Sequence, residues 1–294
     1  TYTSDTVKYF AEMYPQAQLY FLIGGDSLEH FGEWHCPEEI LRYVTLAVAA
    51  RGHQLTDAQA EAFRAKYGCG YTVVNVTPSD TGSTEIRLRY NFGLGVGDVP
   101  PAVDEYVRKH GLYTEYLPLA TKLRKYLTDK RYSHTFYVVK RGLELANDDE
   151  RDKVFTACLL HDCAKYLAPE TYAKYGFVRP DDMPNSVVHA FLGALVARQD
   201  FGITDEEILD AIEYHCTAKP KMSRLAKIVY VADKTEQTRP YPTAHLLQGT
   251  LDEMFVKCLV EANSYCYTHH QDEVYPLTLQ ALGYYAPEVL LTEV

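Results

Sequence analysis

The chain has 294 residues, 47% of them hydrophobic and 23% charged, which is the composition of a globular protein long enough for two domains. Its formal net charge of −11 argues against broad nucleic-acid binding, which needs basic surfaces, but allows a phosphorylated small substrate. No apolar run approaches the roughly 20 residues that a membrane-spanning helix needs. We therefore expect neither nucleic-acid nor membrane partners.

The first part of the chain alternates apolar runs of β character with helical segments. The β-rich runs are 18–25, 45–50 and 71–76, and the expected helices are 4–14, 37–44, 56–68, 83–90 and 101–111. Such alternation predicts an α/β fold, with a parallel sheet and crossover helices.

From about residue 119 the apolar spacing becomes helical for most of the remaining chain. The expected helices are 119–128, 131–147, 151–166, 186–199, 205–215, 223–235 and 249–265. Breakers such as PDDMPN (180–185) and TRPYP (238–242) separate them. We place the boundary near residue 115 and predict an α/β domain over 1–115 and an all-α domain over 116–294.

The seven cysteines are scattered, odd in number and form no CxxC pair. This usage is typical of reduced thiols and predicts a cytoplasmic protein.

The stretch CLLHDCAKYL (158–167) places His161 and Asp162 within an apolar segment. A buried ionised carboxylate costs several kcal/mol unless something compensates it. Candidate partners on other helices are His134, His189, His215 and Asp233. Taken singly, each is more often an ordinary helix residue than a metal ligand, so their order along the chain must carry the interpretation.

That order resembles the HD-domain superfamily of metal-dependent phosphohydrolases. The motifs are SHT (133–135), LLHDCAKY (159–166) and YVADK (230–234), and PNSVVHAFLGA (184–194) and IEYHCTAKPKMS (212–223) add two histidines. Together they make residues 119–280 similar to bacterial symmetrical diadenosine-tetraphosphate hydrolases. The resemblance implies an all-α HD-domain bundle, a two-metal centre and hydrolysis of diadenosine tetraphosphate to two ADP. It favours iron, while manganese and zinc also suit mixed imidazole and carboxylate ligands.

The resemblance also implies the ligand set. Asp162 would bridge the two ions, with His134, His161 and Asp233 completing one and His189 and His215 holding the other. Adjacent helical residues point about 100° apart, so His161 and Asp162 can serve different ions. Two ions about 3.5–4 Å apart lower the pKa of a bridging water and neutralise charge on a phosphoryl group.

Polar residues near this centre are candidates for binding phosphate. Lys165 lies three residues after Asp162, on nearly the same helical face, and is the candidate to contact a phosphate or stabilise the leaving group; a solvated lysine is the alternative. Further candidates are Thr217, Lys219, Lys221, Arg224 and Arg239. For each of them, a solvated surface position is an equal alternative. Cys163 and Cys216, next to expected ligands, are predicted to be packing residues.

A second resemblance covers roughly residues 1–113. TYTSDT (1–6), FLIGGDSLEHFGEW (21–34) and GSTEIR (82–87) resemble nicotinate-mononucleotide adenylyltransferase. The resemblance implies that Thr3 and Trp34 hold the nicotinate ring and that Gly24 and Asp26 contact the nucleotide ribose region. It also implies ATP-phosphate binding at a helix N-terminus by Ser83, Thr84 and Arg87. Gly82 stands where this family usually carries another serine.

The same family opens with a first strand and an HxGH signature, which precede these motifs and have no counterpart in the chain. The doubly wound domain is therefore expected to be incomplete. Either the sequence is a piece of a longer fusion or the domain is a decayed remnant. The intact downstream motifs favour the fusion, in which we expect both activities.

Three classes of function stay open from the sequence. The first is hydrolysis of a dinucleoside polyphosphate, or of another nucleotide such as a deoxynucleoside triphosphate or guanosine tetraphosphate. The second is adenylyl transfer for NAD biosynthesis, and the third is a non-catalytic sensor of metal and nucleotide. The expected partner is a small nucleotide, and the oligomeric state is open between monomer and homodimer.

Overall fold

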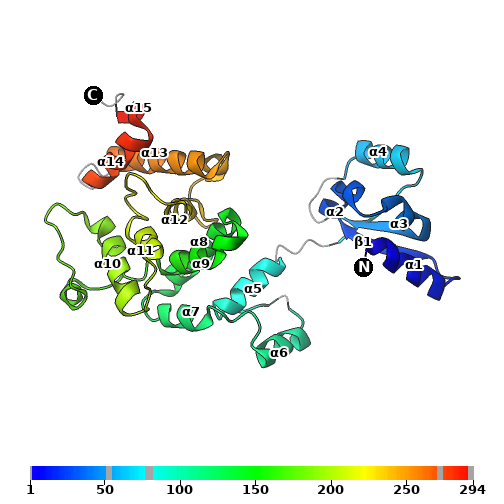
Figure 1. The fold of residues 1–294 in the computed structure, drawn as a ribbon, viewed down its shortest axis with the longest axis horizontal. Coiled ribbons are helices and arrows are strands. Elements are labelled where there is room, and N and C mark those ends of the chain that lie inside the picture. The colour runs from blue at the N-terminus through cyan, green and yellow to red at the C-terminus, as the bar shows by residue number, and fades with distance from the viewer. Residues whose placement is uncertain (1, 51–54, 77–81, 98, 270–273, 291–294) are drawn as a thin grey trace. The chain divides into compact units, whose positions relative to one another are not determined.

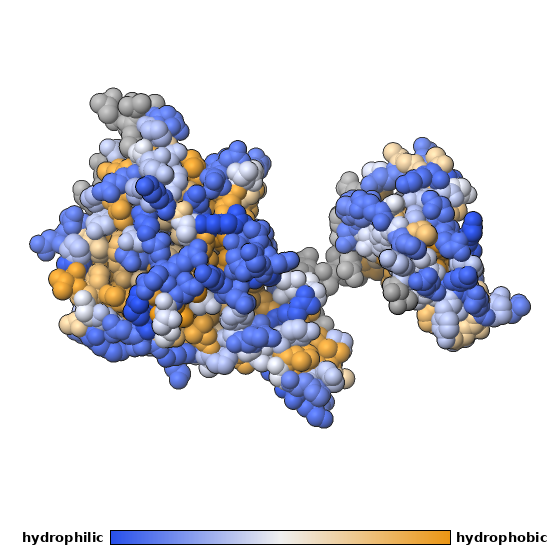
Figure 2. All heavy atoms as spheres, viewed as in Figure 1, coloured by the Kyte–Doolittle hydropathy of each residue, from blue (hydrophilic) through white to orange (hydrophobic). Residues whose placement is uncertain are grey.

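The structure is a computed structural model that describes residues 2–50, 55–76, 82–97, 99–269 and 274–290. The chain divides into two compact units, Thr1–Gly82 and Ser83–Val294, and each is described by itself (Figure 1). Hydrophilic side chains cover much of the visible face of each unit (Figure 2). Among the described residues, the helices are too short or too polar to cross a membrane.

The smaller unit contains a three-stranded parallel sheet in the order β1-β2-β3, as the alternating pattern predicted. Its elements are α1 (Thr3–Met13), β1 (Leu19–Gly24), α2 (Gly25–Glu29), η1 (Phe31–Glu33), α3 (Pro37–Tyr43), β2 (Val44–Ala49), α4 (Asp57–Tyr67) and β3 (Thr72–Val74). In the register, Phe21 lies beside Leu46, and Leu22 beside Ala47.

The two faces of this sheet differ in burial. Leu46 and Val48 of β2 are fully buried and pack with Phe31 and Ile40 in the core of the unit. On β1, Leu22 faces the opposite way because strand side chains alternate, and it is 63% exposed. Parallel sheets are normally covered on both faces, so the described part of this unit leaves apolar strand surface open.

The larger unit is built from helices, as the spacing after residue 119 predicted. Its elements are α5 (Ser83–Asn91), α6 (Pro101–His110), α7 (Leu117–Leu123), α8 (Asp129–Leu145), η2 (Asp148–Glu150), α9 (Arg151–Leu160), η3 (Pro169–Tyr175), α10 (Asn185–Gln199), α11 (Glu206–Glu213), α12 (Arg224–Thr235), η4 (Ala244–Leu247), α13 (Leu251–His269), α14 (Pro276–Tyr285) and α15 (Pro287–Leu290).

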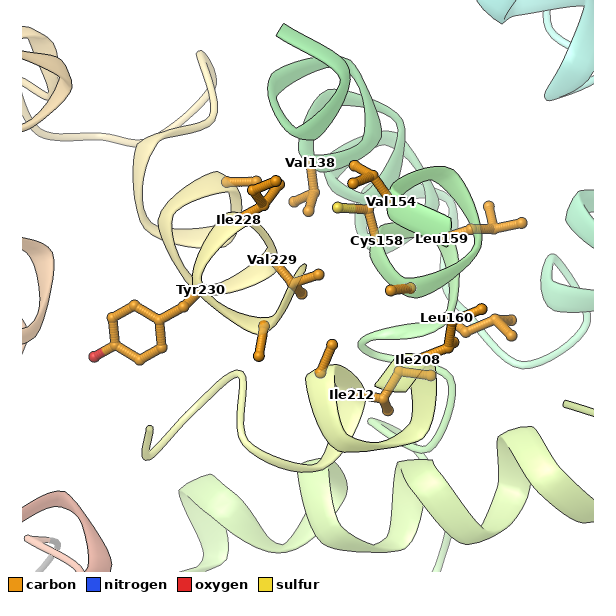
Figure 3. Packing of buried hydrophobic residues seen from close by; sticks show 14 of the residues in the cluster. Val138, Val154, Cys158, Leu159, Leu160, Ile208, Ile212, Ile228, Val229 and Tyr230 are labelled. Atoms are coloured by element: carbon orange, nitrogen blue, oxygen red, sulfur yellow. The ribbon is translucent and has the colours of Figure 1, made fainter. Parts of the chain in front are cut away.

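Helices α8, α9, α11 and α12 enclose the main core, and α9 and α12 each contact the other three. Figure 3 shows Val138, Val154, Ile212 and Val229, one from each of these helices, pointing into a shared interior. All four are fully buried, and burying such a side chain contributes roughly 1.5–3 kcal/mol. This core fixes the helix ends that carry the polar side chains.

Helix α9 is shorter than the sequence predicted. The expected helix covered 151–166, but α9 ends at Leu160, and His161 and Asp162 lie in the turn that follows. The Cys163 amide donates to the Leu160 carbonyl (3.0 Å) and the Lys165 amide donates to the Asp162 carbonyl (2.9 Å). These bonds span three residues instead of four, so the backbone tightens where the polar pair begins.

The compact units divide after Gly82, whereas the sequence placed a domain boundary near residue 115. Leu88 and Phe92 belong to the core cluster of the larger unit, and the Tyr132 hydroxyl donates to the Phe92 carbonyl (2.8 Å). Helix α5 and Phe92 therefore pack with the helical unit. The boundary near residue 115, between the segment that resembles an adenylyltransferase and the segment that resembles an HD domain, stays a prediction.

Candidate metal centre

Six polar side chains expected from the sequence converge in the larger unit. They come from α8 (His134), the turn after α9 (His161 and Asp162), α10 (His189), the turn after α11 (His215) and α12 (Asp233). His134 has a side-chain exposure of 10%, and the other five are buried. Charged and imidazole groups are rarely buried together unless they are paired or bind a metal.

Helix α10 packs closely against α11 and against the turn that carries His161 at Gly193. A Cβ atom at Gly193 would lie 3.3 Å from Ile212 Cγ2 and 3.7 Å from the His161 carbonyl oxygen. The Cys163 thiol donates to the Gly193 carbonyl (3.4 Å), so this thiol points away from the polar cluster. Cys163 therefore packs between elements, as expected.

The first group of candidate ligands is His134, His161 and Asp233, whose ligand atoms lie within 4.8 Å of one another. His134 Nε2 is 3.2 Å from Asp233 Oδ1, and His161 Nε2 is 3.9 Å from the same oxygen. Both Nε2 atoms are buried and make no hydrogen bond. A buried polar atom without a partner calls for an explanation, and a bound cation supplies one.

The other ring nitrogens in this region are held by hydrogen-bond partners. His161 Nδ1 lies 2.7 Å from the Cys158 carbonyl oxygen, and His215 Nδ1 lies 2.7 Å from that of Ile212. His134 Nδ1 is 3.2 Å from Glu236 Oε1. Metal-binding histidines characteristically use one ring nitrogen in this way, which fixes the ring and leaves the other nitrogen for the ion.

Asp162 lies between two groups of imidazoles. Its Oδ2 is 3.3 Å from His161 Nε2 and 4.0 Å from His134 Nε2. Its Oδ1 is 3.0 Å from His189 Nε2 and 3.8 Å from His215 Nε2. One carboxylate thus presents one oxygen to each group, which is the arrangement a bridging ligand requires.

Electrostatics favour the metal-binding forms of Asp162, Asp233 and His161. Burial raises the pKa of Asp162, but its interactions with His161 and the hydrogen bonds from His189 and His215 outweigh that effect and hold the pKa well below its ordinary value. Burial likewise opposes ionisation of Asp233, yet the charges of Lys234 and Arg239 hold its pKa well below its usual range. Burial lowers the pKa of His161, so its ring is neutral near pH 7.

Two of the predicted substrate-binding cations lie at this cluster. Lys165 Nζ is 3.1 Å from His189 Nε2, and both residues line a pocket of about 350 Å³ between the turn after α9 and the start of α10. Arg239 Nη2 is 2.5 Å from Asp233 Oδ1, and its Nε donates to the Asp233 carbonyl (2.7 Å). Arg239 therefore holds a candidate ligand.

The structure does not bring three other predicted residues to the cluster. The Thr217 side chain is fully buried and its hydroxyl donates to the Ala218 carbonyl (3.0 Å). The Lys219 ammonium pairs with Asp210. Arg224 begins α12 and pairs with Glu150 (3.0 Å), while Asp233 lies nine residues further along, about 13 Å of helix rise away.

Sequence reasoning missed Arg131, Glu236 and Cys216. Arg131 Nη1 lies 2.9 Å from Asp162 Oδ2, and its place three residues before His134, on the same helical face, was a usable signal. Cys216 packs against a small hydrophobic cluster, as expected, but it also contacts two candidate ligands. Its Sγ is 3.4 Å from His189 Nε2 and 3.3 Å from His215 Nε2, because residues 214–217 form turns instead of continuing α11.

The residues implied by the adenylyltransferase resemblance fall in both units. In the smaller unit, Thr3 begins α1, Gly24 ends β1, Asp26 is exposed in α2, and Trp34 is half-buried against Phe31 and Phe21. In the larger unit, Ser83, Thr84 and Arg87 form an exposed face of the first turns of α5.

Residues 131–238 match the HD domain family. The chain belongs to this family of hydrolases. It is 35% identical over 129 residues to the symmetrical bis(5'-nucleosyl)-tetraphosphatase of Bacillus subtilis, covering 41% of this chain and 68% of that protein.

Two further relatives extend this similarity. A probable nicotinate-nucleotide adenylyltransferase/Ap4A hydrolase of Mycoplasma pneumoniae is 28% identical over 243 residues, covering 81% of this chain. The chain spans 66% of the length of that relative. The crystal structure of a predicted HD superfamily hydrolase involved in NAD metabolism from Clostridium acetobutylicum aligns with a TM-score of 0.53 and 30% identity, covering 59% of this chain and 98% of that one.

Proposed function

We propose that the helical unit hydrolyses diadenosine tetraphosphate symmetrically to two ADP with two divalent metal ions. The observation that carries the proposal is the position of Asp162, with one oxygen toward His161 and His134 and the other toward His189 and His215. The Bacillus subtilis relative named a symmetrical bis(5'-nucleosyl)-tetraphosphatase supports the substrate class.

The donor set fits two ions. His134, His161 and Asp233 would hold one, His189 and His215 the other, and Asp162 would contact both. Imidazole and carboxylate donors suit iron, manganese or zinc, and the resemblance favours iron. Two bound ions would supply a water activated at neutral pH and would offset the charge of a reacting phosphoryl group.

The protein's own cations divide into two roles. Arg131 and Arg239 each pair with a candidate ligand, so they hold Asp162 and Asp233 in place. Lys165 differs, because the ion pairs among the described residues give it no carboxylate partner. Its ammonium group faces the pocket of about 350 Å³ beside His189 and is therefore available to position a phosphate.

The test uses purified protein with diadenosine tetraphosphate and manganese or anaerobic iron. Release of ADP should fall at least about a hundredfold in Asp162→Asn and His161→Ala, equivalent to ~2.7 kcal/mol of transition-state stabilisation. The matched control is His245→Ala, because His245 lies exposed in the same unit and pairs only with Glu261 among its described contacts. Hydrolysis at the wild-type rate in Asp162→Asn would refute the proposal.

Other nucleotides remain alternatives within the same chemistry. A panel of diadenosine tetraphosphate, deoxynucleoside triphosphates and guanosine tetraphosphate, assayed with the same metal, separates them by relative kcat/KM. A non-catalytic sensor would bind metal and nucleotide but leave every substrate on the panel intact.

We propose a second activity, adenylyl transfer to nicotinate mononucleotide, for a longer protein that contains this chain. The bifunctional name of the Mycoplasma pneumoniae relative supports it, as does the parallel sheet of the smaller unit. In this proposal Thr3 and Trp34 hold the nicotinate ring, Gly24 and Asp26 contact the ribose region, Ser83, Thr84 and Arg87 bind ATP phosphates, and the family boundary lies near residue 115. Pyrophosphate release from ATP and nicotinate mononucleotide should require the longer protein, and release by this chain alone would contradict that expectation.

A further inference from the structure

Next to His215 lies a thiol that the proposed ligand set does not use. Cys216 Sγ is 3.3 Å from His215 Nε2 and 3.4 Å from His189 Nε2, and these three ligand atoms lie within 4.8 Å of one another. Neighbouring side chains usually diverge, but here the chain leaves α11 at Glu213 and turns, with Ala218 in the left-handed region (φ 57°) and its amide donating to the Tyr214 carbonyl (2.9 Å).

We propose that Cys216 is a protein ligand of the second metal ion, together with His189 and His215, and that Asp162 supplies the fourth donor. The inference rests on the proposed metal centre and makes one of its two positions a sulfur-containing site. On binding, the sulfur would coordinate as a thiolate and the two imidazoles as neutral rings, so the protons that these three groups carry would pass to solvent as the metal–ligand bonds form.

The distances agree with a tetrahedral ion. A metal–sulfur bond of about 2.3 Å and a metal–nitrogen bond of about 2.0–2.1 Å place the two donors about 3.5 Å apart. The two sulfur–nitrogen separations are 3.3 and 3.4 Å. Asp162 Oδ1 lies 3.0 Å from His189 Nε2 and 3.8 Å from His215 Nε2, one separation shorter and one longer than the sulfur–nitrogen separations.

Lys165 is the group that competes for this position. Its Nζ is 3.1 Å from His189 Nε2, so it must move when an ion binds there. A lysine has a flexible four-carbon stem, and the pocket it lines offers room beside His189. The movement would carry the ammonium group toward the space we assign to phosphate.

A thiolate donor makes the two metal positions chemically different. The position of His134, His161 and Asp233 offers nitrogen and oxygen alone, whereas sulfur favours softer ions such as zinc at the other position. The centre would therefore accept two different metals, with the softer one held beside Cys216.

Cobalt substitution tests the assignment independently of activity. Cobalt(II) bound by a thiolate shows an intense near-ultraviolet charge-transfer band, which nitrogen and oxygen ligands do not produce. Wild-type protein titrated with cobalt should show this band, and Cys216→Ser should lose it and bind one of its ions about tenfold or more weakly. Cys163→Ser is the matched control, because Cys163 adjoins Asp162 but directs its thiol to Gly193, so its band should persist.

A second measurement needs no variant. X-ray absorption of zinc-loaded wild-type protein should reveal one sulfur neighbour for every two ions, at about 2.3 Å. Cobalt or zinc bound without a sulfur signal would overturn this inference and leave the proposed hydrolase intact. A band that persists in Cys216→Ser would also overturn it, and failure to bind any metal would overturn both proposals.

Discussion

Replacing His161 with leucine should destabilise the helical unit far more in the presence of metal than in its absence. His161 Nε2 is buried without a hydrogen-bond partner, and such a group costs about 1–3 kcal/mol. Leucine removes that cost, has a similar volume, and takes no charge away because burial keeps the His161 pKa low. It also removes the contact of Nδ1 with the Cys158 carbonyl and the contact of Nε2 with Asp162, each worth about 0.5–1.5 kcal/mol.

These gains and losses give a variant that, in chelator, unfolds with a free energy within about 2 kcal/mol of the wild type. With metal at about a hundred times its Kd, each bound ion stabilises the wild type by about 2.7 kcal/mol, and the variant loses this contribution at one position. Adding metal should therefore shift the difference in stability by about 2.7 kcal/mol in favour of the wild type.

Urea unfolding followed by far-ultraviolet circular dichroism measures the difference, because the helices lie mainly in the larger unit. Fluorescence does not serve, since the single tryptophan, Trp34, belongs to the smaller unit. His245→Leu is the control and should shift neither condition by more than about 0.5 kcal/mol, because His245 is exposed. A variant that is equally destabilised with and without metal would refute the reasoning.

Three further predictions follow from particular contacts. Lys165→Ala should lower kcat/KM about tenfold to a hundredfold, which is the value of a charge-assisted hydrogen bond. Its metal content, measured by elemental analysis, should be unchanged, and Lys165→Arg should recover part of the lost activity. A fall in metal content instead would make Lys165 a structural residue. The pKa values of Asp162 and Asp233 are lowered in the folded protein, so these carboxylates contribute stability at a pH above their unfolded-state pKa near 3.8. This stability is lost as the pH falls toward the folded-state pKa values, so metal-free protein should lose helical structure below about pH 4. An unfolding transition near neutral pH would contradict this prediction. Gly142→Ala should destabilise the helical unit by about 1–3 kcal/mol in urea, because its Cβ would lie 2.6 Å from a buried thiol sulfur, while Gly97→Ala, with open space, should be neutral.

Helix positions and the candidate ligands were accessible from the sequence for different reasons. Apolar spacing is a local property, so it predicted α8, α10 and α12 to within two residues at each end. The ligands came from their order along the chain, and the structure places His134, Asp162 and Asp233 in one cluster. The assignment of individual roles to these side chains is still a prediction.

Residues at turns and along helix axes were harder to place. The apolar pattern continues past Leu160, so it gave no sign that the helix ends before His161. Arg224 was assigned to the site because it is close in sequence to His215, but it begins α12 and lies about 13 Å along that helix from Asp233. Cys216 was missed because a helical geometry was assumed where the chain turns.

The position of residues 83–115 shows a further limit. Their motifs resemble a nucleotidyltransferase, yet Leu88 and Phe92 bury their side chains in the helical core. Sequence resemblance reports ancestry, whereas packing depends on which apolar surface lies nearby. This is why the compact units divide at a different residue from the predicted family boundary.

The most direct measurement is product identification by chromatography after incubating the protein with diadenosine tetraphosphate and manganese or iron. The account predicts two ADP per substrate consumed, dependence on added metal, and loss of the reaction in Asp162→Asn. Formation of AMP and ATP, or an intact substrate with the metal bound, would contradict it.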